Sequence, residues 1–184
     1  MSEIRIYIFS WGIPILIVFL GIYLSAKTDI LKDDCQCEIK PYSFARAQLM
    51  WWTLIIISCY SIFYGNYGII QELNKSTLIL LGISLGTTTT ARIIDNTEIN
   101  NGILRHQNDH KHSKGFFNNI LSDGGGISVH RFQALIFNLL FGLIFIVQFL
   151  ESEEGKFTEF GQTELALMGI SSAAYVGLKL NENR

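Results

Sequence analysis

The sequence predicts an all-α, polytopic membrane protein with about five transmembrane helices. Three observations support this fold class: 49% of the 184 residues are hydrophobic, only 16% are charged, and long uncharged runs separate the charged segments. A soluble domain usually carries about 25% charged residues. Uncharged runs of roughly twenty residues have the length of a helix that crosses a bilayer. The chain contains only two prolines, which suits a mostly helical protein.

The first expected transmembrane helix covers residues 1–26, of which residues 6–26 contain no charge. A cleaved signal peptide is the alternative interpretation, because Ser25 and Ala26 are small enough for a cleavage site. The apolar stretch is longer than that of a signal peptide, however, and the first five residues are not clearly basic. We therefore expect a retained helix, with Pro14 as the position of a kink.

Four further apolar runs are expected to cross the membrane: residues 47–64, 77–91, 132–150 and 165–178. Tryptophan and tyrosine residues flank the first of these runs, as they do at membrane interfaces. The runs 77–91 and 165–178 are short, since a helix rises only about 1.5 Å per residue. The run 77–91 spans the bilayer only if Arg92 reaches the interface with its side chain and Ile93 and Ile94 lengthen the helix.

The positive residues predict the orientation of the chain. With five crossings, eleven of the 14 Lys and Arg residues fall on one side, and Arg5, Lys75 and Lys156 fall on the other. Positive residues accumulate on the cytoplasmic side of membrane proteins. We therefore expect a multi-pass protein of the cell inner membrane with its N-terminus outside and its C-terminus in the cytoplasm. The net charge of −2 gives no basic field for nucleic acid, so membrane lipid is the expected partner.

Two parts of the sequence resemble each other. Residues 43–48 and 128–133 both read Ser-x-x-Arg-x-Gln, and each serine is an expected helix N-cap. We infer a duplicated helical hairpin, with copies at residues 43–95 and 128–184 and a cytoplasmic loop at 96–127 between them. Further matches share an offset of 87: residues 78–84 with 165–171, Arg92 with Lys179, and Asp95 with Glu182.

The repeated residues suggest two kinds of contact. Gly82-x-x-x-Gly86 and Gly169-x-x-x-Ala173 allow helices to approach closely, so we expect packing seams within the hairpin pair or between protomers. Polar residues near the cytoplasmic ends of the spans are expected at the membrane interface, as topology anchors or as binding groups for lipid phosphate: Arg46, Gln48, Arg131, Gln133, Arg92 and Lys179.

The pattern Arg-x-Gln before an apolar span, followed by Leu-x-Leu-x-Gly-Ile-Ser, resembles uncharacterised bacterial multi-pass membrane proteins with a duplicated helical hairpin. In those proteins a cytoplasmic Phe-Phe-x-x-x-Leu-Ser-Asp segment precedes the second copy, and residues 116–123 have this sequence. The resemblance covers the chain from Tyr42 onward and leaves the first helix out. It implies the fold and the topology only.

The cytoplasmic loop contains a cluster of histidines. Arg105 and His110 fit the Arg-x4-His motif and so resemble HEPN ribonucleases, but the loop lacks room for the helical bundle that this motif needs. His106, His110 and His112 could ligate a divalent metal together with Asp109, yet no second ligand set of standard spacing accompanies them. We interpret the cluster as a polar loop and a candidate loop site, and we expect no metal and no cofactor.

Two other features of the polar loops are interpreted as structural. Cys35 and Cys37 lie in the first cytoplasmic loop, where a reducing environment disfavours a disulfide. Residues 113–121 place Phe116, Phe117 and Ile120 on one face, which predicts a short interfacial helix leading back to the membrane.

The expected spans contain no Asp, Glu, Lys or His near their middle. Proton-coupled transporters and intramembrane proteases need such groups, so we expect neither a pump nor an enzyme. Four neutral polar residues form a candidate pore lining between protomers: Thr87, Thr88, Thr90 and Asn138. The alternative is hydrogen bonding between helices, which contributes about 0.6 kcal/mol for each bond.

Together these patterns predict a non-enzymatic, homo-oligomeric inner-membrane protein whose helix seams assemble a channel or pore. By analogy with other small multi-pass proteins, it would act as a membrane effector, for example in bacterial defence. The alternative is a membrane anchor or accessory subunit that recruits a cytoplasmic protein through residues 96–127.

Overall fold

The structure is a computed structural model, and it describes residues 2–103, 115–123 and 126–182. The chain is mostly helical (73%), as expected for the all-α class. Its elements are, in chain order, α1 (Ser2–Ile6), the π-helical turn η1 (Tyr7–Gly12), α2 (Ile13–Lys27), α3 (Phe44–Tyr67), α4 (Lys75–Asn100), α5 (Phe116–Leu121), β1 (Ser122–Asp123), β2 (Gly126–Ile127), α6 (Val129–Glu151) and α7 (Gln162–Lys179).

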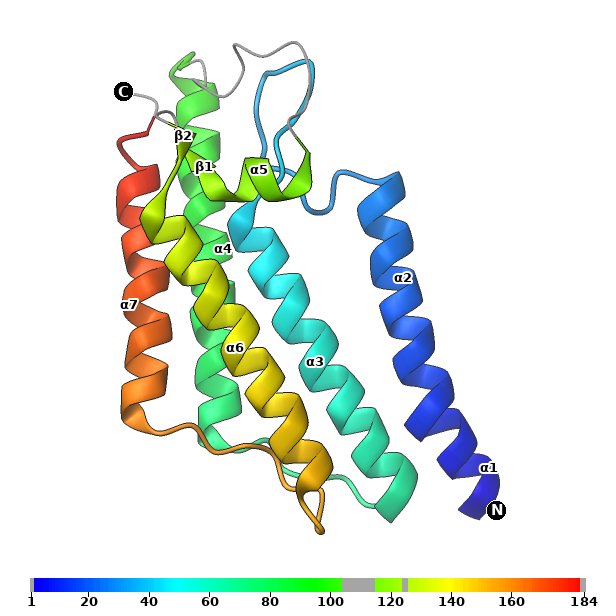
Figure 1. The fold of residues 1–184 in the computed structure, drawn as a ribbon. Coiled ribbons are helices and arrows are strands. Elements are labelled where there is room, and N and C mark those ends of the chain that lie inside the picture. Colours follow the sequence, from blue (N-terminus) through cyan, green and yellow to red (C-terminus); the bar gives the residue numbers. More distant parts are fainter. Residues whose placement is uncertain (1, 104–114, 124–125, 183–184) are drawn as a thin grey trace.

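Helices α3, α4, α6 and α7 form an antiparallel four-helix bundle, and α1, η1 and α2 run along its α3 side (Figure 1). Within the bundle, α3 and α7 each pack against both α4 and α6. We call the end at which α3 and α6 begin and α4 and α7 finish the upper end, as drawn in Figure 1. Helix α1 lies at the lower end, and α7 finishes at the upper end (Figure 1).

Within the described residues, four helical segments are long and apolar enough to cross a membrane: Glu3–Lys27, Phe44–Tyr67, Lys75–Asn100 and Val129–Glu151. The sequence predicted five. Helix α7 is not among the four; its 18 residues are less apolar than the most apolar stretch of each of them, and its uncharged stretch between Glu164 and Lys179 has only 14 residues. Helix α4 is longer than the apolar run from which it was predicted, since it continues through Arg92 to Asn100.

Two apolar clusters fill the bundle. The larger one contains aromatic side chains from α3, α6 and the segment before α7, including Trp52, Phe145 and Phe157. The smaller one lies near the upper end and includes Phe44 and Tyr175. Large apolar side chains are also exposed on the outer faces of the membrane-length helices. A packed interior with an apolar exterior fits a molecule whose solvent is lipid.

The N-terminal helix joins the bundle through η1, which ends two residues before Pro14. The hydroxyl of Ser61 donates to the carbonyl of Phe9 at 2.6 Å, which fastens η1 to α3. A Cβ on Gly65 would collide with Ser10, so the glycine permits this close approach. The irregularity expected at Pro14 is therefore a π-helical turn just before it.

The chain returns from α4 to α6 through α5 and the two-residue antiparallel pair β1–β2. Helix α5 corresponds to the predicted interfacial helix, although residues 113–114 of that prediction lie in the part of the chain that is not described. Of the two expected N-caps, the Ser43 hydroxyl accepts from the backbone N–H of Arg46, whereas Ser128 makes no side-chain capping bond to α6.

Candidate functional site

Buried ion pairs close the upper end of the bundle. Lys179, in the last turn of α7, places Nζ 2.8 Å from Oδ2 of Asp33 and 2.9 Å from Oδ1 of Asp95. The side chains of Lys179 and Asp95 are only 2% and 1% exposed. A buried charge persists where an opposite charge compensates for its lost hydration. Because Asp33 lies in the loop before α3 and Asp95 in α4, the lysine joins three separate segments.

A second buried ion pair lies close to the first. Arg131, in the first turn of α6, donates from Nη2 to the carboxylate of Glu182, just beyond α7. The ring centroid of Tyr175 lies 5.2 Å from Cζ of Arg131 and 6.0 Å from Nζ of Lys179, so both cations gain a cation–π contact. We call this set the charge cluster: Asp33, Asp95, Arg131, Lys179 and Glu182.

A second group of charges, which is partly exposed to solvent, lies next to the charge cluster. Oδ2 of Asp34 accepts from Nη2 of Arg46 at 2.7 Å and lies 3.3 Å from Nε of Arg92. The neighbouring Asp33 is held in place because its backbone N–H donates to the carbonyl of Pro41 at 2.9 Å. Two consecutive aspartates therefore bind the loop to different helices, Asp33 to α7 and Asp34 to α3 and α4.

The predicted interface anchors separate into two groups. An anchoring role at the lipid interface does not fit the first group, because these side chains are buried among partners within the chain: Gln48, Arg131 and Lys179. The second group remains at the surface, where anchoring stays a prediction: Arg46, Arg92 and Gln133.

Neutral polar side chains connect the helices below the charge cluster. Oδ1 of Asn138 accepts from Nε1 of Trp52 at 2.8 Å, and its Nδ2 donates to the carbonyl of Ala134 at 2.8 Å. Nε2 of Gln48 donates to the hydroxyl of Ser172 at 3.2 Å. These bonds join α3 to α6 and to α7. Hydrogen bonding between helices was the alternative role predicted for Asn138.

The four candidate pore-lining residues do not share one surface. Thr87 and Asn138 are buried inside the bundle of the chain itself. Thr88 lies between α3 and α4, where its hydroxyl donates to the carbonyl of Ala45 at 3.0 Å. Thr90 is exposed on the outer face of α4. A pore between protomers therefore cannot be lined by all four.

The small residues of the predicted seams face outward. Apart from its own helix backbone, no atom of the chain lies within 4 Å of a Cβ built on Gly82 or Gly86. A Cβ on Gly169 would meet one atom, Cδ1 of Ile83, at 3.9 Å, and Ala173 is exposed. A seam within the hairpin pair is therefore excluded for Gly82 and Gly86, which leaves contact with another copy or with lipid.

Cys35 and Cys37 are paired as a disulfide in the structure, whereas the sequence disfavoured a disulfide in this loop. The chain reverses between Asp33 and Pro41, so the two cysteines lie on either side of the turn at Gln36, with Cα atoms 5.3 Å apart. The prediction rested on the reducing environment of the cytoplasm. It did not include the turn at Gln36, which brings the two cysteine side chains together.

The histidine cluster of the long loop falls outside the described residues: Arg105, His106, Asp109, His110 and His112. In the part of the chain that the structure describes, no group of three His, Cys, Asp or Glu side chains could hold a metal ion.

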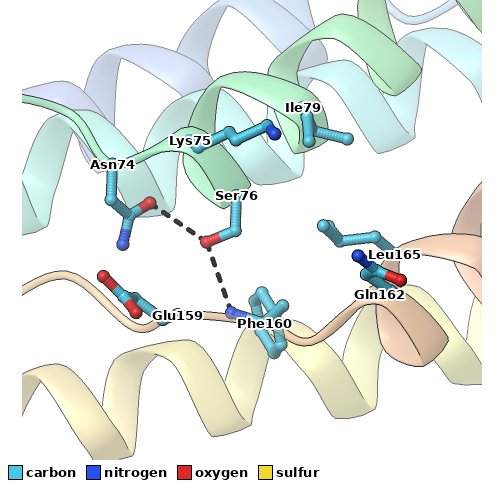
Figure 2. Close-up of a pocket in the computed structure, with 8 residues that line it drawn as sticks. All are labelled: Asn74, Lys75, Ser76, Ile79, Glu159, Phe160, Gln162 and Leu165. Atoms are coloured by element: carbon cyan, nitrogen blue, oxygen red, sulfur yellow. Dashed lines mark hydrogen bonds between the residues drawn. The ribbon is translucent and has the colours of Figure 1, made fainter.

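A pocket of about 280 Å³ lies at the lower end, where α4 and α7 begin (Figure 2). Oδ1 of Asn74 caps α4 by accepting from the backbone N–H of Thr77 at 2.8 Å. The hydroxyl of Ser76 lies 3.1 Å from that Oδ1 and accepts from the backbone N–H of Phe160 at 3.3 Å. These polar groups are used to join two helix starts, so we interpret this pocket as a structural junction.

The charge cluster is thus the candidate site. Its buried ion pairs hold four segments of the chain together. The sequence identified its cations but missed Asp33, Asp95 and Glu182 as their partners. The offset of 87 that relates Asp95 to Glu182 was the available signal, since the predicted repeat aligns these two acidic residues. The chain matches no protein-family model, no curated protein and no solved structure.

Proposed function

We propose that the chain is a non-enzymatic, homo-oligomeric protein of the inner membrane, and that copies assemble through the outer face of α4 into a channel or pore. The observation that carries this proposal is the open space beside Gly82 and Gly86. Together with Thr90 they occur at every fourth residue, so they form one stripe along the helix. Small residues in such a stripe let two membrane helices approach closely.

In this proposal α7 is the fifth crossing, with the N-terminus outside and the upper end in the cytoplasm. Eleven of the 14 Lys and Arg residues support that orientation. The charge cluster is the cytoplasmic latch, because Lys179 ties α4, the helix at the proposed interface, to α7 and to the first cytoplasmic loop. Opening the latch would free α4 to shift within the oligomer.

The test is to replace the stripe with bulky side chains. Gly86→Leu should reduce the assembled mass of the detergent-purified protein to that of one chain and abolish potassium efflux from loaded liposomes. Gly177→Leu is the matched control, because Gly177 on α7 is equally open within the chain. A wild-type protein that is monomeric in both detergent and nanodiscs, or unchanged efflux from Gly86→Leu, would exclude the proposal.

A second candidate is a membrane anchor for a cytoplasmic protein. Large apolar side chains are exposed at the upper end, in the segment that follows residues 104–114 in the sequence: Phe117 (67%), Ile127 (72%) and Val129 (81%). Exposed apolar groups next to a polar loop are typical of a protein-binding surface. Deleting residues 98–126 should then release a co-purifying partner, and retention of that partner would count against this role.

A further inference from the structure

The disulfide between Cys35 and Cys37 lies directly beside the residues that bind the first loop to the bundle. The two aspartates that precede Cys35 supply carboxylates to three helices. Asp33 binds to α7, and Asp34 binds to α3 and α4. At most one residue separates the disulfide from either aspartate, so the geometry of the turn decides where both carboxylates lie.

Backbone hydrogen bonds close this loop at its base. The backbone N–H of Asp33 donates to the carbonyl of Pro41 at 2.9 Å, and that of Ser43 donates to the carbonyl of Leu31 at 2.7 Å. The disulfide cross-links the turn between these contacts. A cross-link removes conformations that an open loop would sample. It therefore lowers the entropic cost of closing the loop and of holding both carboxylates against their partners.

A reductant in water can reach this disulfide. Both of its cysteines are only partly buried, and Gln36 and Glu38 beside them are exposed. The loop connects α2 to α3 and lies outside both candidate membrane spans. Cys59, in contrast, is a free cysteine buried within α3. The chain thus contains an accessible cysteine pair and an inaccessible thiol for comparison.

We propose that Cys35 and Cys37 form a reversible redox site, which exchanges with a dithiol and thereby controls how firmly the loop holds the charge cluster. A thiolate of the dithiol attacks one sulfur, the S–S bond breaks, and the other cysteine leaves as a thiolate. The second thiol of the dithiol then attacks the mixed disulfide and releases the remaining cysteine. Two electrons pass to the protein, its two thiolates take up the two protons that the dithiol loses, and the dithiol becomes a disulfide.

Reduction frees the turn, so the pairs of Asp33 with Lys179 and of Asp34 with Arg46 loosen. The proposed orientation places this loop in the cytoplasm, where exposed cysteines are kept reduced. Oxidising conditions would then form the disulfide and tighten the upper end. The exchange itself depends on neither the proposed pore nor the proposed orientation, because it is measured on the purified protein.

The first test measures thiol reactivity of the full chain in phosphatidylcholine nanodiscs. N-ethylmaleimide should modify no cysteine of the oxidised protein, and after dithiothreitol it should modify Cys35 and Cys37. Oxidised glutathione should restore the disulfide. Cys59 is the internal control, because burial should protect it until the protein unfolds.

Thioredoxin in place of dithiothreitol distinguishes the source of the dithiol. Reduction by both reagents would support exchange with protein dithiols, and reduction by dithiothreitol alone would support exchange with small dithiols. A disulfide that neither reagent opens in the folded protein would overturn the proposal.

Hydrogen exchange tests the link to the charge cluster. On reduction, residues 28–43 and residues 172–182, which include Lys179, should exchange several-fold faster, whereas residues 153–160 at the lower end should not change. The double variant Cys35→Ser/Cys37→Ser should exchange at the faster rate without reductant and should not respond to it. Cys59→Ser is the matched control and should respond like the wild type. Faster exchange confined to residues 28–43 would show that the disulfide does not control the charge cluster.

Discussion

The two ends of the bundle are joined by different chemistry. At the upper end, Lys179 binds Asp33 and Asp95 through charges that are buried from solvent. At the lower end a neutral amide makes the corresponding connection, since Nδ2 of Asn74 donates to the carbonyls of Phe157 and Thr158 at 3.0 and 2.9 Å. At both ends a loop is therefore bound to the first or last turn of a helix. The upper end uses ion pairs, and the lower end uses neutral hydrogen bonds.

Aromatic rings complete the lower end. Phe157 stacks on Tyr60 and on Phe149, with centroids 6.2 and 5.9 Å apart. The hydroxyl of Tyr67 donates to the carbonyl of Glu153 at 2.8 Å. Such contacts depend little on pH or salt, because no group in them changes charge. The contacts at the lower end are therefore expected to persist when the pH or the salt concentration changes.

Loss of a single interaction partner is expected to cost more stability at the upper end than at the lower end. Loss of one partner from a neutral hydrogen bond costs roughly 1–3 kcal/mol. Loss of one partner from a buried ion pair costs roughly 3–5 kcal/mol, because the remaining charge stays in a medium that solvates it poorly. Loss of one charge is therefore expected to destabilise the upper end more than loss of one hydrogen bond destabilises the lower end.

The largest effect is expected for Lys179→Met, which removes the cation shared by Asp33 and Asp95. The free energy of unfolding should fall by about 3–5 kcal/mol. Denaturant unfolding of the protein in micelles, followed by tryptophan fluorescence, measures this loss. Lys179→Arg keeps the charge and should retain most of the stability. A loss below about 1 kcal/mol in Lys179→Met would remove the distinction between the two ends.

A smaller effect at the same end is expected for Glu182→Gln, which leaves Arg131 without its carboxylate. The loss should be about 1.5–3 kcal/mol, below the value for a fully broken buried pair, because the glutamine carbonyl can still accept a hydrogen bond from Arg131. It is smaller than for Lys179→Met because only one pair is broken. The same micelle unfolding assay measures it, and equal losses in the two variants would show that the two pairs act as one unit.

At the lower end, Asn74→Ala should cost about 1–2 kcal/mol through the lost N-cap of α4. Ser43→Ala is the matched change at the upper end, and its cost should be lower because the Ser43 capping bond is long, at 3.5 Å. Unfolding midpoints of both variants measure the difference. A larger loss in Ser43→Ala would contradict this ranking of the two caps.

The smallest effect is expected for Asp29→Asn, at the surface of the upper end. The hydrogen bond from Lys32 lowers the pKa of Asp29, with a second pair to Lys40 at 3.4 Å. A lowered pKa stabilises the fold above the unfolded pKa of about 3.9, and that contribution is lost as the pH falls through the folded pKa. Because these charges are solvated, unfolding midpoints of variant and wild type should coincide from pH 7 to about 3. A clear separation near neutral pH would show that the outer charges share the buried character of the cluster.

The membrane-length helices were predictable because lipid imposes a simple requirement on each segment by itself. The ion pairs were not, because Lys179 meets Asp33 across 146 positions and no local pattern encodes that distance. The predicted repeat misled in part: it aligns Arg92 with Lys179, yet Lys179 is buried and Arg92 is 66% exposed. The loop that contains Asp33 has no matching segment at the offset of 87 residues. Arg92 and Lys179 therefore lie in different surroundings.

The short uncharged stretch of α7 also affects the surrounding bilayer. Fourteen residues rise about 21 Å, whereas the hydrocarbon core of a typical bilayer is about 30 Å thick. If α7 crosses the membrane as proposed, the lipid beside it must thin, or a neighbouring protein must shield the helix ends. In that arrangement the mismatch would favour thinner membranes and contact between copies.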